Sequence, residues 1–187
     1  MVARGLTYEH VGATRPADVD WPPAAAPSGF RRHTSTVLIG RDDDGSAGAV
    51  WRAASAAVLA WGVKTRSGFT VHPPPGPDGV REGEEVWLRA ALGPFTVREP
   101  VRVVAVVDTV DRAGFAYGTL HGHPVSGEEA FVVHRGADGR VHLTLRSMTR
   151  AAPRGPWRAA FPALLVAQRV YRRRYQRALV TADRLLG

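Results

Sequence analysis

The residues best suited to chemistry lie close together, between Tyr117 and Glu129. This stretch holds a phenol, a threonine hydroxyl, two imidazoles and two carboxylates, carried by Tyr117, Thr119, His121, His123, Glu128 and Glu129. Alternate residues of a strand share one face, so Tyr117 and Thr119 can point together into a cavity, and Gly118 between them allows a close approach. The segment is therefore the first candidate for a ligand site.

Two other uses of this segment stay open. His121 and His123, with Glu128 or Glu129, have the donor types that bind zinc or carry protons near neutral pH. Alternatively, the histidines close a hairpin loop through hydrogen bonds, and a glutamate pairs with an arginine such as Arg102. The structural use is the commoner one, so no catalytic residue, metal or cofactor is assigned. Trp61 is a further candidate for the pocket wall, although tryptophans more often serve the core.

Several reaction classes find no support in the sequence. The chain has no cysteine, which removes disulfides, thiolate metal sites and thiol nucleophiles. It also lacks the Gly-x-Ser-x-Gly elbow, the Gly-x-x-x-x-Gly-Lys phosphate loop and the His-Glu-x-x-His zinc motif. Asp42, Asp43 and Asp44 precede a helix-forming stretch, where Asp44 or Ser46 can cap a free amide. A metal site is the rarer use of such an acidic run.

The positive charge of the chain is concentrated at its C-terminal end. The formal net charge is +8, and residues 154–187 hold eight arginines against one acid, Asp183. A basic stripe with aromatic rings can bind nucleic acid. However, Tyr171 and Tyr175 fall on the apolar side of the predicted helix, and no nucleic-acid-binding motif is present. The exposed charge is typical of a solvated face that attracts anionic surfaces weakly, and nucleic acid binding is a secondary alternative.

The elements that must position the candidate residues are mostly strands. After Gly68, β-branched and aromatic runs alternate with turn signals, which predicts an antiparallel meander. The predicted strands cover residues 69–72, 86–92, 95–97, 101–108, 114–120, 129–135 and 140–149. Residues 5–14 and 33–39 are also predicted as strands, separated by a Pro-rich surface loop at 16–27.

Two helices are predicted. The first covers residues 46–61, which are rich in alanine, and the second runs from Pro156 to Leu186. The apolar stripe of the second helix consists of Trp157, Phe161, Leu164, Gln168, Tyr171, Tyr175, Ala178, Ala182 and Leu185. Pro162 is a position where this helix can kink. A long amphipathic helix beside one antiparallel sheet predicts that the sheet curves around the helix and leaves a cavity between them.

Several motifs, in this order, resemble the DUF1990 family, a domain of unknown function. They are the stretch from Tyr8 to Thr14, Gly29-Phe30-Arg31, Trp61 before Val71-His72-Pro73, Arg102-Val103-Val104 leading to Asp108, and above all GFAYGTLHGH at 114–123 and SGEEAF at 126–131. The resemblance covers nearly the whole chain. It implies a helix-grip fold like that of birch-pollen-allergen-like and START-like lipid-transfer domains, and it implies no established activity.

We therefore expect a single α+β domain over residues 1–187, in which a curved antiparallel sheet wraps around a long C-terminal helix. The expected function is binding of a small hydrophobic or amphipathic molecule between sheet and helix. The expected pocket residues are Trp61, Arg102, Tyr117, Thr119, His121, His123, Glu128 and Glu129. The alternative is a hydrolase or cyclase-like enzyme that uses His121 or His123 with Glu128. The composition favours a cytoplasmic protein without a transmembrane segment, and it assigns no oligomeric state.

Overall fold

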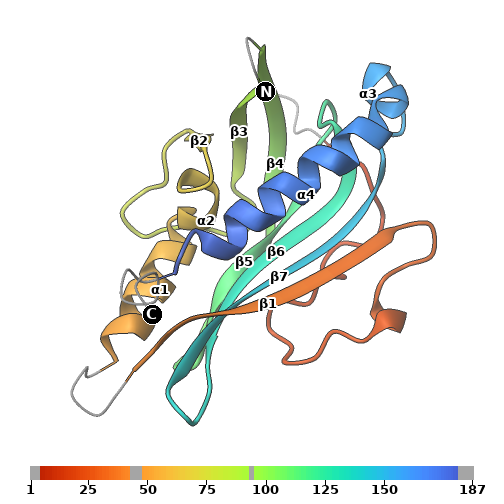
Figure 1. Cartoon of the computed structure of the whole chain (residues 1–187). Helices are drawn as coiled ribbons and strands as arrows, with labels where there is room; N and C mark the ends of the chain where they lie inside the picture. Colours follow the sequence, from red (N-terminus) through yellow and green to blue (C-terminus); the bar gives the residue numbers. More distant parts are fainter. Residues whose placement is uncertain (1–4, 43–47, 93–94, 181–187) are drawn as a thin grey trace.

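In the computed structural model, seven antiparallel strands form one curved sheet (Figure 1). The structure describes residues 5–42, 48–92 and 95–180. The strands are β1 (Arg31–Arg41), β2 (Phe69–His72), β3 (Glu85–Leu92), β4 (Phe95–Asp108), β5 (Arg112–Thr119), β6 (Val125–Arg135) and β7 (Arg140–Ala151). Their order, β1-β7-β6-β5-β4-β3-β2, confirms the predicted meander from β2 to β7 and adds β1 beside the last strand.

Two of the predicted strands are one continuous strand. Residues 95–97 and 101–108 both belong to β4, which also includes the intervening Pro100. Leu120 donates its N–H to the Pro100 carbonyl at 3.0 Å, so the missing amide of the proline also faces the β5 side. The ladder of residue pairs between β4 and β5 begins only at Val101. Pro100 is therefore tolerated because it lies just beyond this ladder.

The helices occupy the inner, concave side of the sheet. They are α1 (Ala49–Leu59), α2 (Gly62–Thr65), α3 (Pro156–Ala159) and α4 (Phe161–Arg177). A short 3-10 turn, η1 (Pro23–Ala25), lies instead in the N-terminal segment. α4 crosses the concave side of the sheet, and α1 and α2 lie on the same side, near the C-terminal end of α4 (Figure 1). No helix in the described ranges is both long and apolar enough to cross a membrane.

The C-terminal helix differs in detail from its prediction. The single helix expected over 156–186 is divided at Ala160, because Pro162 occupies the first turn of α4, where no N–H donor is needed. α4 ends at Arg177. The stripe positions Ala182 and Leu185 lie outside the described residues.

The first helix begins later than predicted, and the side chain that caps it, that of Asp42, belongs to the loop before it. α1 starts at Ala49, and the two carboxylate oxygens of Asp42 accept the N–H groups of Val50 and Trp51 at 2.8 and 3.2 Å. These amides have no partner within the helix, so the carboxylate stabilises the helix start. The other expected capping positions, Asp43, Asp44 and Ser46, lie outside the described residues.

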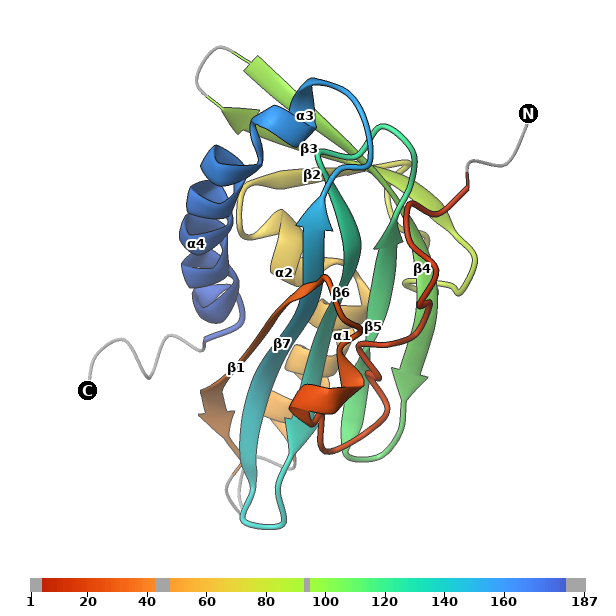
Figure 2. The ribbon, with the colours of Figure 1, turned by 90° about the vertical axis from the view of Figure 1, so that its right-hand side faces the viewer.

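The N-terminal segment, residues 5–30, covers the outer face of the sheet (Figure 2). The prediction of a strand over 5–14 is wrong. Only Leu6 pairs, in a single bridge with Leu120, and turns follow from residue 11. The alternating residue types of this stretch imitate a strand, but most of its hydrogen bonds go to side chains of the sheet.

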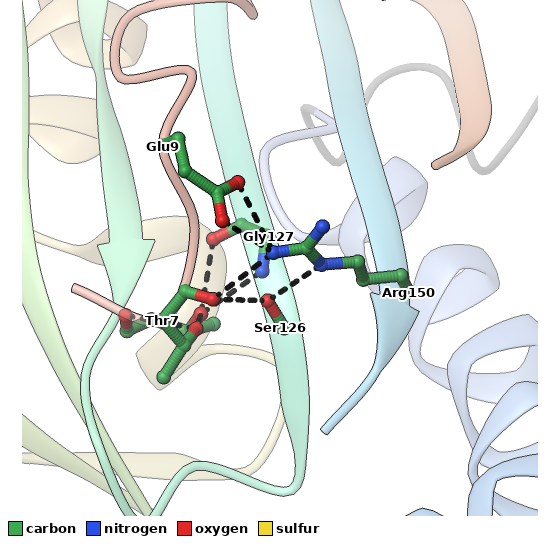
Figure 3. A network of polar contacts seen from close by, with 6 residues as sticks. Thr7, Glu9, Ser126, Gly127 and Arg150 are labelled. Atoms are coloured by element: carbon green, nitrogen blue, oxygen red, sulfur yellow. Dashed lines mark hydrogen bonds and ion pairs between the residues drawn. The ribbon is translucent and has the colours of Figure 1, made fainter. Parts of the chain in front are cut away.

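Figure 3 shows one group of these contacts. Ser126 and Arg150 both donate to the carbonyl oxygen of Thr7, at 2.9 and 3.3 Å. Arg150 also forms an ion pair with Glu9 at 3.2 Å (Figure 3). The segment is thereby fixed to β6 and β7 without forming a strand of its own.

The core lies between the inner face of the sheet and the helices. Trp61, Phe115 and Phe131 are the largest fully buried side chains, and the rings of Trp61 and Phe115 meet edge to face with centroids 4.5 Å apart. Burial of each such side chain contributes about 2–3 kcal/mol. Trp61 has a left-handed backbone (φ 61°) between α1 and α2. This turn changes the direction of the chain and places Lys64 of α2 beneath α4, where it contacts Tyr175.

Candidate functional site

A pocket of about 100 Å³ lies between α4 and the inner face of the sheet. Its apolar walls include Phe69, Ala90 and Val97 from the sheet and Leu164 and Tyr171 from α4. Its polar lining residues are Lys64, Glu99, Tyr117, Thr119, His123, Glu128, Glu129, Thr149, Gln168, Arg172 and Tyr175. The pocket is thus amphipathic, and its polar groups come from strands and helices far apart in the sequence.

A buried lysine and glutamate form the polar centre of the pocket. Lys64 Nζ lies 3.0 Å from the Glu129 carboxylate and donates to the Tyr175 hydroxyl at 2.7 Å. The Tyr117 hydroxyl donates to the same carboxylate. Burial, followed by the charge of Glu129, raises the pKa of Tyr117 and of Tyr175 well above the ordinary value, so both phenols stay protonated. Only 2% of Lys64 is exposed, so its charge loses hydration at a cost of several kcal/mol, which the attraction to Glu129 offsets.

Aromatic rings surround the same ammonium group. Lys64 Nζ is 4.6 Å from the ring centroids of Phe69 and Tyr175 and 5.1 Å from that of Tyr117. The negative faces of aromatic rings attract a cation, and more strongly when the cation is removed from water. The lysine is therefore held by both a carboxylate and a partial aromatic cage.

Glu99 and His123 form a second polar wall. The main chain of Val125 engages Nδ1 of His123, with its nitrogen and oxygen 3.1 and 3.0 Å away, and Nε2 lies 3.8 Å from the Glu99 carboxylate. Burial raises the pKa of Glu99 from 4.5 to about 7, although Lys64 opposes this shift. Burial, followed by the charge of Lys64, lowers the pKa of His123 to about 3. At pH 7 the histidine is neutral, and Glu99 is present in both protonation states.

α4 adds a polar group without a partner. The Oε1 atom of Gln168 is buried and has no hydrogen bond within the described residues. Nearby, Arg172 donates to the Ser147 hydroxyl at 3.1 Å, and burial lowers its pKa below the ordinary value. An unsatisfied buried acceptor is costly, so Gln168 marks a position where a donor is missing.

The structure brings five of the eight predicted pocket residues to the pocket. These five are Tyr117, Thr119, His123, Glu128 and Glu129. The other three lie elsewhere: Trp61 is fully buried in the core, Arg102 pairs with Glu85 at 2.5 Å, and His121 is exposed.

Backbone geometry explains two of these displacements. Arg102 alternates with Val101 and Val103, which are buried on the inner face, so its side chain lies on the outer face. His121 and His123 are separated by Gly122, whose φ of 99° turns the chain sharply. The two imidazoles therefore do not share a face as they would in a continuous strand.

Glu128 and Glu129 are neighbours with different environments. Both oxygens of the Glu128 carboxylate accept hydrogen bonds from the N-terminal segment: from Tyr8 Oη at 2.7 Å, from the amides of Gly12 and Thr14 at 2.8 and 2.9 Å, and from the Thr14 hydroxyl. The enzyme alternative needs a free Glu128, which this arrangement does not provide. Within the described ranges, no three His, Asp or Glu side chains gather closely enough to hold a metal ion.

Thr119 is also engaged at the pocket rim. Its hydroxyl accepts the N–H of Gly127 at 2.9 Å and lies 2.5 Å from the Thr7 hydroxyl. Thr119 thus links β5, β6 and the N-terminal segment.

Sequence reasoning missed two pocket residues, the central Lys64 and Glu99 of the second polar wall. Lys64 is the only lysine among the 25 basic residues, a departure from the arginine bias of the chain that could have drawn attention to it. Glu99 carried no such signal, because nothing local distinguishes it from other strand glutamates. Tyr171, Tyr175 and Gln168 were predicted to lie on the covered stripe of the C-terminal helix, and all three line the pocket.

The exposed side of α4 carries arginines together with Val166 and Val170, and its tyrosines are turned away from solvent. Arg169, Arg173 and Arg177 are exposed, whereas the ring of Tyr171 packs against Phe69 with centroids 4.7 Å apart. Tyr175 is 4% exposed. Neither tyrosine is placed to stack on a nucleic acid base.

The sequence profile of one protein family matches this chain over residues 7–178, and its description reads "Domain of unknown function (DUF1990)". The chain belongs to the DUF1990 family. A curated relative, the UPF0548 protein of Deinococcus radiodurans, is 44% identical over 97 residues, which are 51% of this chain and 48% of that protein. The match thus spans about half the length of the relative.

Solved structures resemble this DUF1990 protein in fold. The crystal structure of the hypothetical protein jhp0584 from Helicobacter pylori superimposes with a TM-score of 0.52 at 13% identity, over 87% of this chain and 94% of that chain. Ara h 8.0201 gives a TM-score of 0.47 at 11% identity, over 82% of this chain and 100% of its own. Together with the curved sheet and the C-terminal helix, the first of these similarities supports the helix-grip α+β fold.

Proposed function

We propose that this protein binds a small amphipathic molecule in the pocket between α4 and the sheet. The observation that carries the proposal is a pair of acceptors without protein donors. Among the described residues, Gln168 Oε1 has no hydrogen-bond partner, and no hydrogen bond reaches the Glu99 carboxyl, which lies 3.8 Å from His123 Nε2. Both groups line a pocket that also has apolar walls, formed by Phe69, Ala90, Val97 and Leu164. A ligand with an apolar body and a hydroxyl or amine head supplies the missing donor.

The size of the pocket limits the ligand. Drug-sized ligands occupy about 300–1,000 Å³, whereas this pocket has about 100 Å³. An engineered apolar cavity of about 150 Å³ accommodates benzene. We therefore propose a molecule of about one ring, or one end of a longer molecule.

A general acid–base role of Glu99 is a second candidate function. Its pKa of about 7 and its position on the pocket wall are the properties that such a group needs. This role would replace the one assigned from sequence to Glu128, whose oxygens are occupied. We also retain the cytoplasmic location as a proposal, because the chain lacks cysteine.

Phenol is a suitable probe because its ring fits the apolar walls and its hydroxyl can donate to Glu99. Binding is measured by NMR titration of the isotope-labelled protein, beside native mass spectrometry for molecules that co-purify. The blocking variant is Ala167→Phe, at the pocket, and the matched control is Ala163→Phe, at an exposed position of the same helix.

The expected result is that phenol shifts the resonances of pocket residues in the wild type and in Ala163→Phe. The same shifts are at least tenfold weaker in Ala167→Phe. If the wild type neither binds phenol nor retains any molecule, or if Ala167→Phe binds equally well, the pocket is not a ligand site.

A further inference from the structure

A second hollow lies on the outer face of the sheet, away from α4. It has a volume of about 230 Å³, and the N-terminal segment forms one of its walls. Its lining residues are Val19, Asp20, Trp21, Arg32, Thr34, Thr36, Arg112, His134, Thr144 and Arg146. Three arginines from three strands, β1, β5 and β7, therefore border one space.

Arg146 is the most deeply placed of the three arginines. It is 3% exposed, and its two terminal nitrogens donate to the carbonyl oxygens of residues 14, 15, 18 and 19, which fixes the loop over the hollow. Its Nε atom is buried and has no hydrogen-bond partner within the described residues. Arg146 thus holds the N-terminal segment in place as one wall of the hollow, and its Nε–H group remains an unused donor.

Arg32 and Arg112 have fewer contacts. Arg32 stacks on the ring of Trp21 at 4.1 Å and donates to the Trp21 carbonyl, while its Nε is buried without a partner. Arg112 is 8% exposed and has one long hydrogen bond, to the Pro16 carbonyl at 3.4 Å. Guanidinium groups present several N–H donors in a plane, so most of this capacity remains free.

The charges of the three arginines are not neutralised by carboxylates. No ion pair joins Arg32, Arg112 or Arg146 to an acid within the described residues. Asp20 is the one acid in the lining and is exposed, and Asp18 pairs with Arg15 at 3.6 Å. Among the residues that line this space, three arginines thus stand against one acid, while Asp18 and Asp111 act on Arg112 from outside the lining.

The histidine on the same wall responds to this field. Burial, followed by the charge of Arg112, lowers the pKa of His134 to about 4, and Arg146 contributes in the same direction. His134 is therefore neutral at pH 7. Its Nε2 lies 3.0 Å from the Thr144 hydroxyl, which lies 2.8 Å from that of Thr36, so neutral polar groups complete the wall.

We infer that this outer hollow binds a tetrahedral oxyanion, namely phosphate or the phosphate group of an ester. Arginine pairs with such oxygens through parallel hydrogen bonds, and the three arginines with Asp20 leave a positive charge that balances a phosphate dianion. A water molecule occupies about 30 Å³ of liquid, so 230 Å³ holds the anion and part of an attached group. This site is separate from the pocket beneath α4 and does not depend on the function proposed there.

The test measures binding of inorganic phosphate by isothermal titration calorimetry at constant ionic strength, with chloride as the reference anion. Arg112→Gln removes one charge and only one weak protein contact. Thr34→Phe fills the hollow from an exposed position of β1 and keeps every charge. Arg98→Gln, at an exposed position of β4, is the charge-matched control. Circular dichroism establishes that each variant is folded.

We expect the wild type and Arg98→Gln to bind phosphate with a Kd of about 1 mM or tighter. Binding weakens about tenfold or more in Arg112→Gln and in Thr34→Phe, because a charge-assisted contact or the space itself is lost. Absence of phosphate binding to the wild type, or binding by both variants as tight as that of the wild type, would overturn the inference.

Two further ligands distinguish the source of the phosphate. Glycerol 3-phosphate represents soluble esters, and vesicles of phosphatidic acid and phosphatidylcholine (about 1:3) represent a lipid head group. In each case loss of binding in Arg112→Gln supports the site. Binding that Arg98→Gln reduces as strongly as Arg112→Gln contradicts it, because nonspecific attraction depends on net charge alone.

Discussion

Replacing Glu128 by glutamine tests whether this carboxylate anchors the N-terminal segment. Oε2 accepts from Tyr8 and from the amide of Gly12, and Oε1 accepts from the amide and hydroxyl of Thr14. A glutamine keeps one of these oxygens and turns the other into an NH₂ group that faces two donors. A hydroxyl can rotate and accept, but a backbone N–H cannot. One main-chain amide therefore loses its acceptor whichever way the new side chain is oriented.

The expected loss of stability follows from this count. A hydrogen bond to a charged group contributes about 1.5–3 kcal/mol, and a buried donor without a partner costs about 1–3 kcal/mol. Glu128 is 2% exposed, so water does not replace the lost acceptor. With partial relaxation of the segment, we expect Glu128→Gln to lower the free energy of unfolding by about 3 kcal/mol.

Urea unfolding followed by circular dichroism measures this free energy, and hydrogen exchange of the Gly12 and Thr14 amides reports on the segment itself. Glu82→Gln, which neutralises an exposed carboxylate, is expected to stay within about 0.5 kcal/mol of the wild type. If Glu128→Gln also stays within that range, with unchanged protection of both amides, the anchoring role is refuted.

Two further substitutions address the pocket. Lys64→Met leaves Glu129 without its cation and is expected to lower the free energy of unfolding in urea by about 3–5 kcal/mol. The double variant Lys64→Met/Glu129→Gln is expected to recover most of this loss, and an equal loss in both variants would contradict the pairing. The raised pKa of Glu99 gives stability that is present below pH 4.5 and is lost as pH rises through about 7. Glu99→Gln is therefore expected to gain up to about 3 kcal/mol relative to the wild type between pH 5 and 8, and a pH-independent difference would show that the carboxyl does not titrate there.

The sheet was predictable from sequence because its strands have one face on the core. Residues 69–72 and 140–149, for example, match β2 and most of β7, since alternation of apolar residues is a local property. The same alternation gave a wrong prediction for residues 5–14, which do not form a strand. The hydrogen-bond partners of this segment are the acceptor Glu128 and the donor Arg150, each more than a hundred residues away, and no local pattern encodes them.

The candidate site shows the same division. Glu129 and Tyr117 were within reach of sequence reasoning because strand alternation fixes their face. The use of Glu128 was not: alternation puts it on the opposite face from Glu129, but only the fold shows that the N-terminal segment occupies its carboxylate. Glu99 acquires its raised pKa from the burial created by α4 and the sheet together, which a sequence pattern does not contain.

The pairing of β1 has a consequence for synthesis on the ribosome. Arg31 lies opposite Thr149, and Arg41 lies opposite Arg140, so this early strand finds its neighbour only in the last quarter of the chain. Until β7 has left the exit tunnel, the emerging polypeptide carries a strand with an unpaired edge, the kind of surface on which nascent chains associate wrongly. A meander that begins at β2 can form progressively, whereas β1 can join the sheet only after β7 has been synthesised.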